Sequence, residues 1–340
     1  MFRRPASIAL LAFFAVIVGL FCLFAPNFAT TSNFENLMSG FSFVAILAMG
    51  QSFPILLRGI DLSIGAMVAL AGMVAFDLTM LFHVPGYLIL PLVLIAATSA
   101  GAINGMLIVY LRLQPFIATL ATLAAYRGVV YAISGRLLIP KLATTPITDP
   151  WIVGIETYFD IGGALGISDY VHLPWFPLSF FLMIAIFITF QVLLLSTKLG
   201  RDIYTVGGNQ EAARLAGINT RGITILTYAI SGFCAGVAAL ILVARLTTST
   251  EALGTGMELT AISAAVIGGV SLQGGIGSMF GPVIGAFLLG VVLIGLTLLG
   301  ASQYVQQILT GAILLAAVCY DRYLVVQRQR RAAANVGANT

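Results

Sequence analysis

Long apolar runs alternate with short polar connections along the whole chain. Segments of about 20 apolar residues recur, and each can cross a hydrocarbon core of about 30 Å. Because lipid offers the backbone no hydrogen-bond partners, such segments form helices. The pattern predicts ten membrane-spanning helices: about Ser7–Phe24, Ser39–Leu57, Leu62–Leu81, Tyr87–Leu111, Phe116–Ser134, Phe176–Ser196, Ile223–Ala244, Glu258–Gly274, Met279–Leu299 and Tyr304–Tyr320. The eighth of these is broken by glycines.

One polar run, Lys198–Arg221, interrupts this pattern with the sequence KLGRDIYTVGGNQEAARLAGINTR. It predicts a short helix of its own, because Asn209 is a good N-cap, Glu211 falls in the first turn and Gly217 can end the helix. The apolar face of this helix consists of Ala212, Leu215 and Ala216. A helix of about two turns is unstable alone in water, so its apolar face needs a partner. That partner is either another protein or the neighbouring helices of the same chain.

The distribution of lysine and arginine predicts the orientation. With ten spans and the N-terminus inside, 12 of the 16 basic residues fall on the inner side, 3 fall outside and 1 lies within a span. This bias towards the inner side is typical of cytoplasmic loops and termini. Both termini and the polar run are therefore predicted to be cytoplasmic. The start of the chain could also be read as a signal peptide, but its apolar run is longer than a signal core and favours a retained helix.

The composition fits an integral membrane protein, with 60% hydrophobic and 8% charged residues. We expect one transmembrane domain over residues 1–322, with a periplasmic loop at 135–175 and the cytoplasmic loop at 198–222. Residues 323–340 are predicted to be a basic, disordered cytoplasmic tail near anionic lipid headgroups. The net charge of +4 comes from arginines on the inner side and needs no nucleic-acid partner.

Signatures of catalysis and of bound cofactors are missing from the sequence. The chain has no GxxxxGK[ST] phosphate loop, no nucleophile with an adjacent base, and 2 histidines in total. Its 3 cysteines all fall within predicted spans, with neither disulfide nor metal spacing. We therefore expect no enzyme activity, no metal site and no cofactor bound by this chain. The predicted outer face is acidic, which reflects ordinary topology bias or a docking surface for an external partner.

The short cytoplasmic helix also resembles a known motif. Glu211-Ala212-Ala213 followed by Gly217 is similar to the EAA signature of ABC importer permeases, and the loop around it resembles the ribose-type branch of monosaccharide permeases. In that family this helix docks into a groove of the ATP-binding subunit. The resemblance implies a coupling site formed by Gly208, Asn209, Gln210, Glu211, Ala212, Ala213, Leu215 and Gly217.

Three further segments match the same branch in chain order. They are RGIDLSIGAMVAL at Arg58–Leu70, INGMLIVYLRLQPFIATLATL at Ile103–Leu123 and the glycine-rich stretch Gly254–Ala286. Two positions depart from the family pattern: Arg58 stands where glycine is frequent, and Gln114 where proline is frequent. These departures concern the local geometry of loops near the inner face.

The resemblance implies a function and a set of partners. The chain is expected to be the permease subunit of an ATP-driven bacterial importer for a monosaccharide, a pentose, hexose or similar polyol. It would lie in the inner membrane as a multi-pass protein surrounded by lipid, in a homodimer or a heterodimer with a similar permease. ATP and Mg would be bound by a separate ATP-binding cassette subunit, and a periplasmic sugar-binding protein would deliver the substrate.

Polar residues within or near the spans are candidates for the substrate path. Asp61 is costly at membrane depth, so it either caps the helix that begins at Leu62, with Arg58 as ion partner, or acts in gating. Hydroxyls, amides and an aromatic ring suit a sugar, although interhelical hydrogen bonding is the ordinary use of such groups. The other candidates are Asn104, Thr119, Thr122, Tyr126, Arg127, Gln191 and Glu258.

Glycines in the last third of the chain have two interpretations. Gly277, Gly281 and Gly285 are spaced by four and predict a helix face stripped of side chains for close packing. The pairs Gly268-Gly269 and Gly274-Gly275 could serve as hinges during transport.

Two other functions are compatible with a polytopic membrane protein. An ion-gradient-driven secondary transporter of a small polar solute usually has carboxylates within its spans, whereas here the acidic residues lie near the span ends. A structural or receptor-like protein would leave the several collinear matches unexplained.

Overall fold

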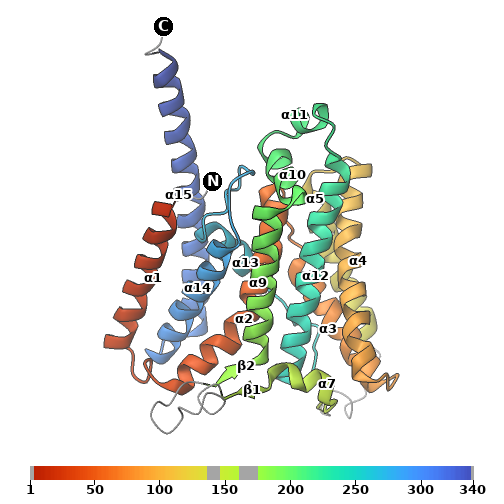
Figure 1. Cartoon of the computed structure of the whole chain (residues 1–340). Helices are drawn as coiled ribbons and strands as arrows, with labels where there is room; N and C mark the ends of the chain where they lie inside the picture. The colour runs from red at the N-terminus through yellow and green to blue at the C-terminus, as the bar shows by residue number, and fades with distance from the viewer. Residues whose placement is uncertain (1–3, 136–145, 161–174, 338–340) are drawn as a thin grey trace.

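The computed structural model describes residues 4–135, 146–160 and 175–337 of the chain, and most of them are helical (Figure 1). The helices in chain order are α1 (Arg4–Phe24), α2 (Thr31–Leu56), α3 (Ile64–Met80), α4 (Gly86–Tyr110), α5 (Pro115–Ser134), α7 (Pro150–Val153), the 3₁₀ helix η1 (Gly154–Glu156), α9 (Leu178–Ser196), α10 (Lys198–Gly208), α11 (Gln210–Leu215), α12 (Thr220–Leu246), α13 (Met257–Ile267), α14 (Phe280–Leu298) and α15 (Gln303–Gly337).

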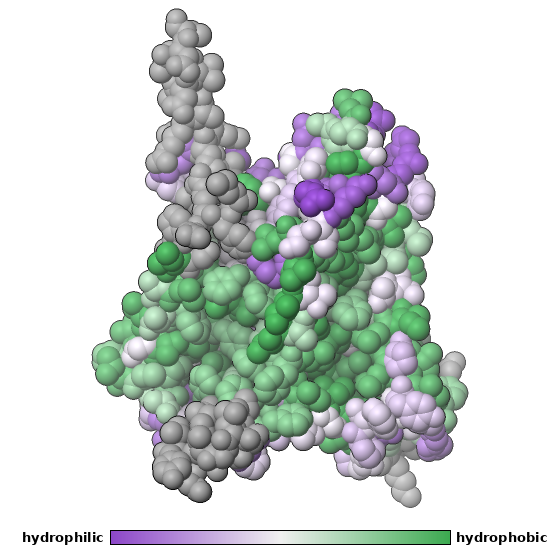
Figure 2. Space-filling model, viewed as in Figure 1, coloured by the Kyte–Doolittle hydropathy of each residue, from purple (hydrophilic) through white to green (hydrophobic). Residues whose placement is uncertain are grey.

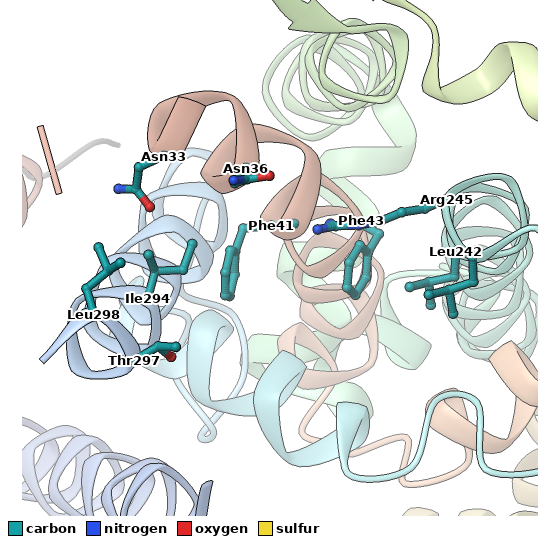
Figure 3. Close-up of a pocket in the computed structure, with 11 residues that line it drawn as sticks. Asn33, Asn36, Phe41, Phe43, Leu242, Arg245, Ile294, Thr297 and Leu298 are labelled. Carbon is teal, nitrogen blue, oxygen red and sulfur yellow. The ribbon is translucent and has the colours of Figure 1, made fainter. Parts of the chain in front are cut away.

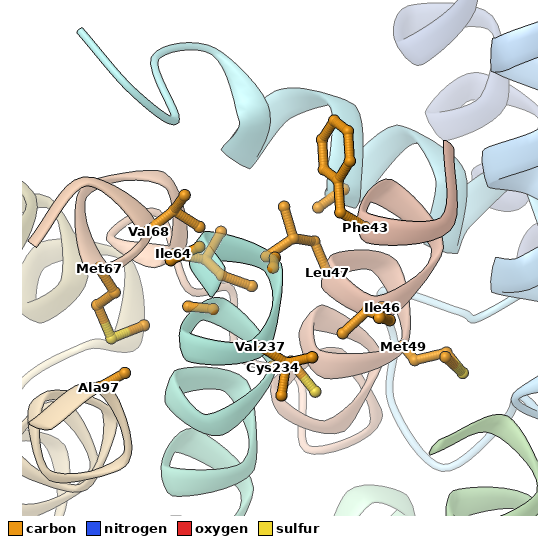
Figure 4. Close-up of a cluster of buried hydrophobic side chains, with 14 of the residues drawn as sticks. Phe43, Ile46, Leu47, Met49, Ile64, Met67, Val68, Ala97, Cys234 and Val237 are labelled. Atoms are coloured by element: carbon orange, nitrogen blue, oxygen red, sulfur yellow. The ribbon is translucent and has the colours of Figure 1, made fainter. Parts of the chain in front are cut away.

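The core of the fold is built around α2. Its apolar part is 89% buried, and α12, α14, α13 and α9 pack against it. Figure 4 shows one part of this core, where Ile46 and Leu47 of α2 lie near Val237 of α12 and Ile64 of α3. Polar side chains such as Ser42, Gln51 and Ser52 are buried along α2, and a helix with such groups is better enclosed by other helices than exposed to lipid.

Helices α4 and α12 pack closely because small residues line their contact. A Cβ added to Gly101 would lie 2.9 Å from the backbone nitrogen of Gly232, and one added to Gly236 would lie 2.9 Å from the Cβ of Ala97. Small residues let helix backbones approach in a membrane, where van der Waals packing stabilises the contact between helices.

Each predicted span corresponds to a helix, and the differences lie at the ends. Among the described residues, six helices are long and apolar enough to span a membrane by length and composition, and four shorter apolar helices accompany them. Helix α2 begins at Thr31, before the predicted Ser39, because Thr30 is the N-cap and accepts a hydrogen bond from the backbone of Asn33.

Two predictions about helix ends were wrong. The eighth span ends at Ile267 instead of Gly274, because Gly269 and Gly274 adopt positive φ angles of 87° and 75°, which break a helix. The tail predicted to be disordered from residue 323 continues α15 as far as Gly337. Its sequence, rich in Gln, Arg and Ala, has high helix propensity.

The fold also contains a two-stranded antiparallel sheet, which the all-α prediction did not include. Strand β1 (Tyr158–Phe159) pairs with β2 (Phe176–Pro177) beside η1. This sheet belongs to the predicted loop at 135–175, of which residues 136–145 and 161–174 lie outside the described residues. The described part of the loop packs against the end of the bundle through Ile152, which is fully buried.

The two ends of the bundle differ in what they present. Figure 1 shows the beginning of α1, the end of α15 and helices α10 and α11 at one end, with α7, β1 and β2 at the other. Figure 2 shows a broad apolar belt between these ends and polar residues gathered over α10 and α11. An apolar belt of this kind is the surface that an integral membrane protein presents to lipid.

Candidate functional site

The cytoplasmic loop predicted from the sequence folds as two short helices, α10 and α11. The Oδ1 atom of Asn209 accepts a hydrogen bond from the backbone of Ala212 at 3.0 Å, which confirms Asn209 as the N-cap of α11. Gly217 has a φ of 80°, and the Ile218 backbone donates to the Ala213 carbonyl, so the helix ends as predicted. Helix α10 was not predicted, although Thr197 caps it by accepting from the Gly200 backbone.

Helix α11 exposes most of its surface. Ala213 is fully buried and anchors the helix, whereas Leu215 is 77% exposed and Ala212 and Ala216 are exposed as well. The apolar face predicted from Ala212 and Leu215 therefore points away from the chain. Leu215 and the two alanines thus form a small exposed apolar face on a helix of 6 residues.

The charges on α11 form one ion pair. Arg214 Nη2 lies 2.6 Å from Glu211 Oε1, and both side chains are about two-thirds exposed. The hydrogen bond and the positive charge of Arg214 hold the pKa of the Glu211 carboxyl below its ordinary value. Exposed pairs of this kind contribute little to stability, so Glu211 and Arg214 remain free to exchange partners.

Helix α10 is fastened to two loops of the membrane domain. Arg58, which follows α2, donates from Nε to the Gly207 carbonyl at 3.0 Å and also donates to the Gly208 carbonyl. Tyr204 donates from its hydroxyl to the Gly277 carbonyl at 2.7 Å. The α2 end and the loop between α13 and α14 therefore both contact the helix that precedes α11.

The glycines predicted as hinges lie in this loop between α13 and α14. The Gly275 backbone donates to the Leu56 carbonyl at 2.8 Å, and Gly274 has a positive φ of 75°. A Cβ on Gly207 would collide with the Leu56 carbonyl oxygen. The structure thus brings Gly208, which the sequence predicts to be a coupling residue, into the same contact as Gly274 and Gly275. A hinge role for these glycines stays a prediction.

The row of glycines spaced by four packs as predicted at two of its three positions. A Cβ on Gly281 would overlap the carbonyl group of Gly268, and one on Gly285 would overlap the carbonyl of Ala264. Helices α13 and α14 touch backbone to backbone at these two points. Gly277 does not share this helix face, because α14 begins at Phe280.

Asp61 lies fully buried among hydroxyl groups and away from Arg58. Its Oδ1 accepts from the backbone and the hydroxyl of Ser63, and its Oδ2 accepts from the Ser231 hydroxyl at 2.8 Å. The Gln51 amide, in the orientation that satisfies both of its ends, pairs with the Asp61 backbone. The expected ion pair with Arg58 is absent, because Arg58 turns outwards to the carbonyls at the end of α10.

Four predicted path residues belong to the same polar network. Asn104 donates to the Ser63 hydroxyl at 2.7 Å, and the Tyr126 hydroxyl donates to the Ala100 carbonyl at 2.8 Å. Thr119 and Thr122 donate to backbone carbonyls at Ile60 and Thr119. These bonds join α4 and α5 to each other and to the GIDLS segment that contains Asp61, except for the Thr122 bond, which lies within α5. A direct role of these residues in the substrate path stays a prediction.

The two remaining charged candidates lie beside the turns that precede α13. Arg127 of α5 donates to the carbonyls of Glu251 and Leu253, both at 2.8 Å. Glu258, in the first turn of α13, lies so close to Gly65 of α3 that a Cβ there would collide with its carboxylate. Gln191 of α9 accepts from the backbone of Met279 at 3.0 Å.

An open cavity of about 540 Å³ lies at the end of the bundle opposite to α11. Figure 3 shows its walls, made by the beginning of α2 and the ends of α12 and α14. Its lining comprises Asn33, Asn36, Gly40, Phe41, Phe43, Leu242, Arg245, Leu246, Ile294, Thr297 and Leu298. Sequence analysis missed these residues, because none of them lies in a segment that resembled a known motif.

Known proteins resemble the chain over most of its length. The sequence model of a family described as the permease component of branched-chain amino acid transport systems matches residues 33–318. The ribose import permease of Escherichia coli K12 is 37% identical over 326 residues, which cover 94% of this chain and 93% of the relative.

Two other sugar permeases of the same bacterium are similar to the same extent. The D-allose transport permease is 36% identical over 91% of this chain and 90% of the relative, and the L-arabinose permease is 36% identical over 92% and 90%. No solved structure matches the chain.

Proposed function

Since the chain belongs to the permease family of ABC importers that includes the ribose, allose and arabinose permeases, we propose that it imports a monosaccharide in an ATP-driven complex. The permeases of this family are membrane-embedded subunits and not enzymes. The single observation that carries the proposal is helix α11, which presents Glu211 and an exposed Leu215 outside the membrane domain.

The proposed orientation has ten spans, with both ends of the chain in the cytoplasm. The six long apolar helices, together with the four shorter ones, support this number. Helix α11 lies at the same end of the bundle as the beginning of α1 and the end of α15 (Figure 1), in agreement with an even number of crossings. The positive-inside bias of the sequence places this end in the cytoplasm of a bacterial inner membrane.

The proposed partners act at opposite ends of the bundle. An ATP-binding subunit would hold ATP and Mg and would dock on α11, and a periplasmic sugar-binding protein would dock near α7 and the β1–β2 sheet. A second permease, identical or similar, would complete the path. This chain would contribute no bond-forming chemistry: its residues would move the path from one side of the membrane to the other.

The contacts of α10 support a route for this movement. A displacement of α11 would pull on α10, whose end is bonded to Arg58 after α2 and whose Tyr204 is bonded to the loop before α14. Helix α2 is the centre of the packed core, so a shift at its end would reach the helices around it.

Transport measurements in proteoliposomes test the proposal against an ion-gradient mechanism. Sugar uptake should require ATP and the partner ATPase and should persist after an ionophore is added. Uptake that proceeds without the ATPase and collapses with the ionophore would overturn the proposal.

The role of α11 can be tested by a charge reversal. Glu211→Lys should leave the protein inserted in the membrane and should weaken capture of the ATPase in a pull-down, with loss of ATP-dependent uptake. Glu251→Lys makes the same charge change at an exposed residue outside α11 and serves as control. Undiminished capture by Glu211→Lys would contradict the docking role.

A further inference from the structure

We propose that the open cavity between α2, α12 and α14 is a binding site for one monosaccharide ring on its way into the path. This inference rests on the proposed importer function and names a place in the chain where the sugar is held. The volume of about 540 Å³ lies within the range of small-molecule sites, about 300–1,000 Å³. A monosaccharide fits there with several water molecules.

The position of the cavity suits a sugar that arrives from outside. It opens at the end of the bundle opposite to α11, the end where α7 and the β1–β2 sheet lie. In the proposed orientation this end faces the periplasm. The residues come from the beginning of α2, the helix around which the core is built, so an occupant would touch the same helix that Arg58 connects to α10.

Two side chains in the cavity offer donors that the described part of the chain does not use. Neither Asn36 nor Arg245 makes a hydrogen bond to another described residue, and both are exposed. A guanidinium has five N–H groups and an amide has two, together with a carbonyl acceptor. Two neighbouring hydroxyl oxygens of a sugar can each accept a hydrogen bond from such a guanidinium or amide group.

The guanidinium of Arg245 lies beside Gly40 and Phe43 of α2. Figure 3 shows the side chain reaching from α12 towards Phe43 on α2. A Cβ added to Gly40 would lie 3.2 Å from Nη1 of Arg245, so the glycine leaves the room that the guanidinium needs. Behind it lies Glu156, whose carboxyl feels the charge of Arg245 and accepts from the Ser39 hydroxyl at 3.1 Å.

Aromatic rings complete the site. Phe41 and Phe43 line the cavity beside Arg245. The C–H faces of a sugar ring pack on aromatic rings, and the hydroxyls around the ring edge then meet the polar groups. Asn33 and Thr297 are already bonded, to the Phe28 carbonyl and the Leu293 carbonyl, so they shape the wall and Asn36 and Arg245 recognise the ligand.

The chemistry of the lining favours a sugar over a free amino acid. An amino acid carries an ammonium group that needs a carboxylate or several carbonyl acceptors, and the described residues of the lining include no Asp or Glu side chain. A neutral polyol needs no charge partner. The cation and the amide can both donate to it, and the rings exclude water from one of its faces.

Protection from chemical labelling tests the site directly. The exposed cysteines Cys22 and Cys319 are first changed to Ser, whereas the buried Cys234 is kept. Asn36→Cys is then introduced, so that it is the one accessible thiol among the described residues. Maleimide labelling is followed in the assembled transporter with D-ribose, D-allose or L-arabinose as probes. We expect the sugar that the wild type transports to slow labelling in a saturable way, and the other sugars to have less effect. Phe34→Cys, on the same helix but outside the cavity, should label at one rate throughout.

Substitutions of residues in the cavity wall then test whether these residues bind the sugar. Arg245→Met in the Asn36→Cys background should raise the sugar concentration for half-maximal protection about fivefold or more, the loss expected for one hydrogen-bonding group. Gly40→Leu, which fills the place of the guanidinium, should abolish protection. Labelling that slows only when the binding protein is added without sugar would assign the surface to that protein and overturn the proposal.

The outcome is distinguishable from a failure of the proposed function. If the wild type takes up none of the sugars with ATP and the ATPase present, the importer function fails. If the wild type transports a sugar and that sugar leaves Asn36→Cys labelling unchanged, the importer function stands and the binding site is wrong.

Discussion

Arg58 donates a hydrogen bond from Nε to the carbonyl oxygen of Gly207, 3.0 Å away, and so joins the end of α2 to the last turn of α10. Carbonyl groups at the end of a helix lack partners within the helix and carry partial negative charge, so a guanidinium is well suited to them. Arg58 holds a left-handed φ of 64° to reach this position. The bond connects the segment that precedes α11 with the centre of the core.

Replacing Arg58 by glycine should loosen the coupling and spare the fold. Glycine accepts a φ of 64° without strain, so Arg58→Gly removes the guanidinium alone. The loss of a charge-assisted hydrogen bond costs about 2 kcal/mol at the contact between α2 and α10. We expect ATP hydrolysis to continue while sugar uptake per ATP falls severalfold, measured as uptake and phosphate release in the same proteoliposomes.

Arg112 provides a matched control for this experiment. It is also an exposed arginine with a left-handed φ, 55°, in the connection between α4 and α5, and it makes no hydrogen bond to another described residue. Arg112→Gly should leave uptake per ATP unchanged. Equal losses in the two variants would mean that the arginines act through general charge and not through the bond to α10.

The hydrophobic pattern predicted the helices well because lipid thickness fixes how long an apolar run must be. Helix α4, predicted as Tyr87–Leu111, is found at Gly86–Tyr110, and the N-cap of α11 was also found from residue type and position. Local chemistry was enough in both cases.

Partners between distant residues could not be predicted in this way. Arg58 and Asp61 are three positions apart and of opposite charge, which favoured an ion pair, yet Arg58 bonds to Gly207 and Asp61 bonds to Ser231. Packing of α10 and α12 decides their partners, and the sequence of the GIDLS segment holds no signal for it. The outer cavity was missed for the same reason, since it forms only where three distant helices meet.

The buried bonds of Asp61 predict a graded loss of stability. Asp61→Ala should leave the hydroxyls of Ser63 and Ser231 without their acceptor and lower the free energy of unfolding by about 3 kcal/mol. Asp61→Asn keeps one acceptor oxygen and should cost less. Thermal unfolding of the purified protein in detergent measures both.

Transport by the Asp61→Asn variant separates the two interpretations of this residue. If Asp61 is structural, uptake should follow the amount of folded protein. A variant that is as stable as the wild type but takes up no sugar would contradict the structural role and favour gating.

The contact between α13 and α14 should not tolerate a methyl group. Gly281→Ala places a Cβ on the carbonyl of Gly268, a backbone group that cannot turn aside, and should destabilise the protein by about 1–3 kcal/mol. Gly311→Ala, within α15 and with nothing within 4 Å of an added Cβ, should be neutral or slightly stabilising. The yield of monodisperse protein and its melting temperature measure the difference, and equal values for the two variants would refute the backbone contact.

Glu156 should make stability depend on pH. Burial raises the pKa of its carboxyl above the ordinary 4.5, and the nearby Ser179 hydroxyl, the hydrogen bond from Ser39 and the charge of Arg245 offset this only in part. The folded protein therefore holds this proton more tightly than the unfolded chain. The stabilisation is complete below pH 4.5 and is lost as the pH rises through the folded pKa.

The variant Glu156→Gln tests this dependence. It keeps the shape of the side chain without a titrating group, so its melting temperature should fall less than that of the wild type as the pH is raised from 4.5. Glu251→Gln, at an exposed carboxylate, should follow the wild type, and a Glu156→Gln profile parallel to the wild type would show that another group causes the dependence.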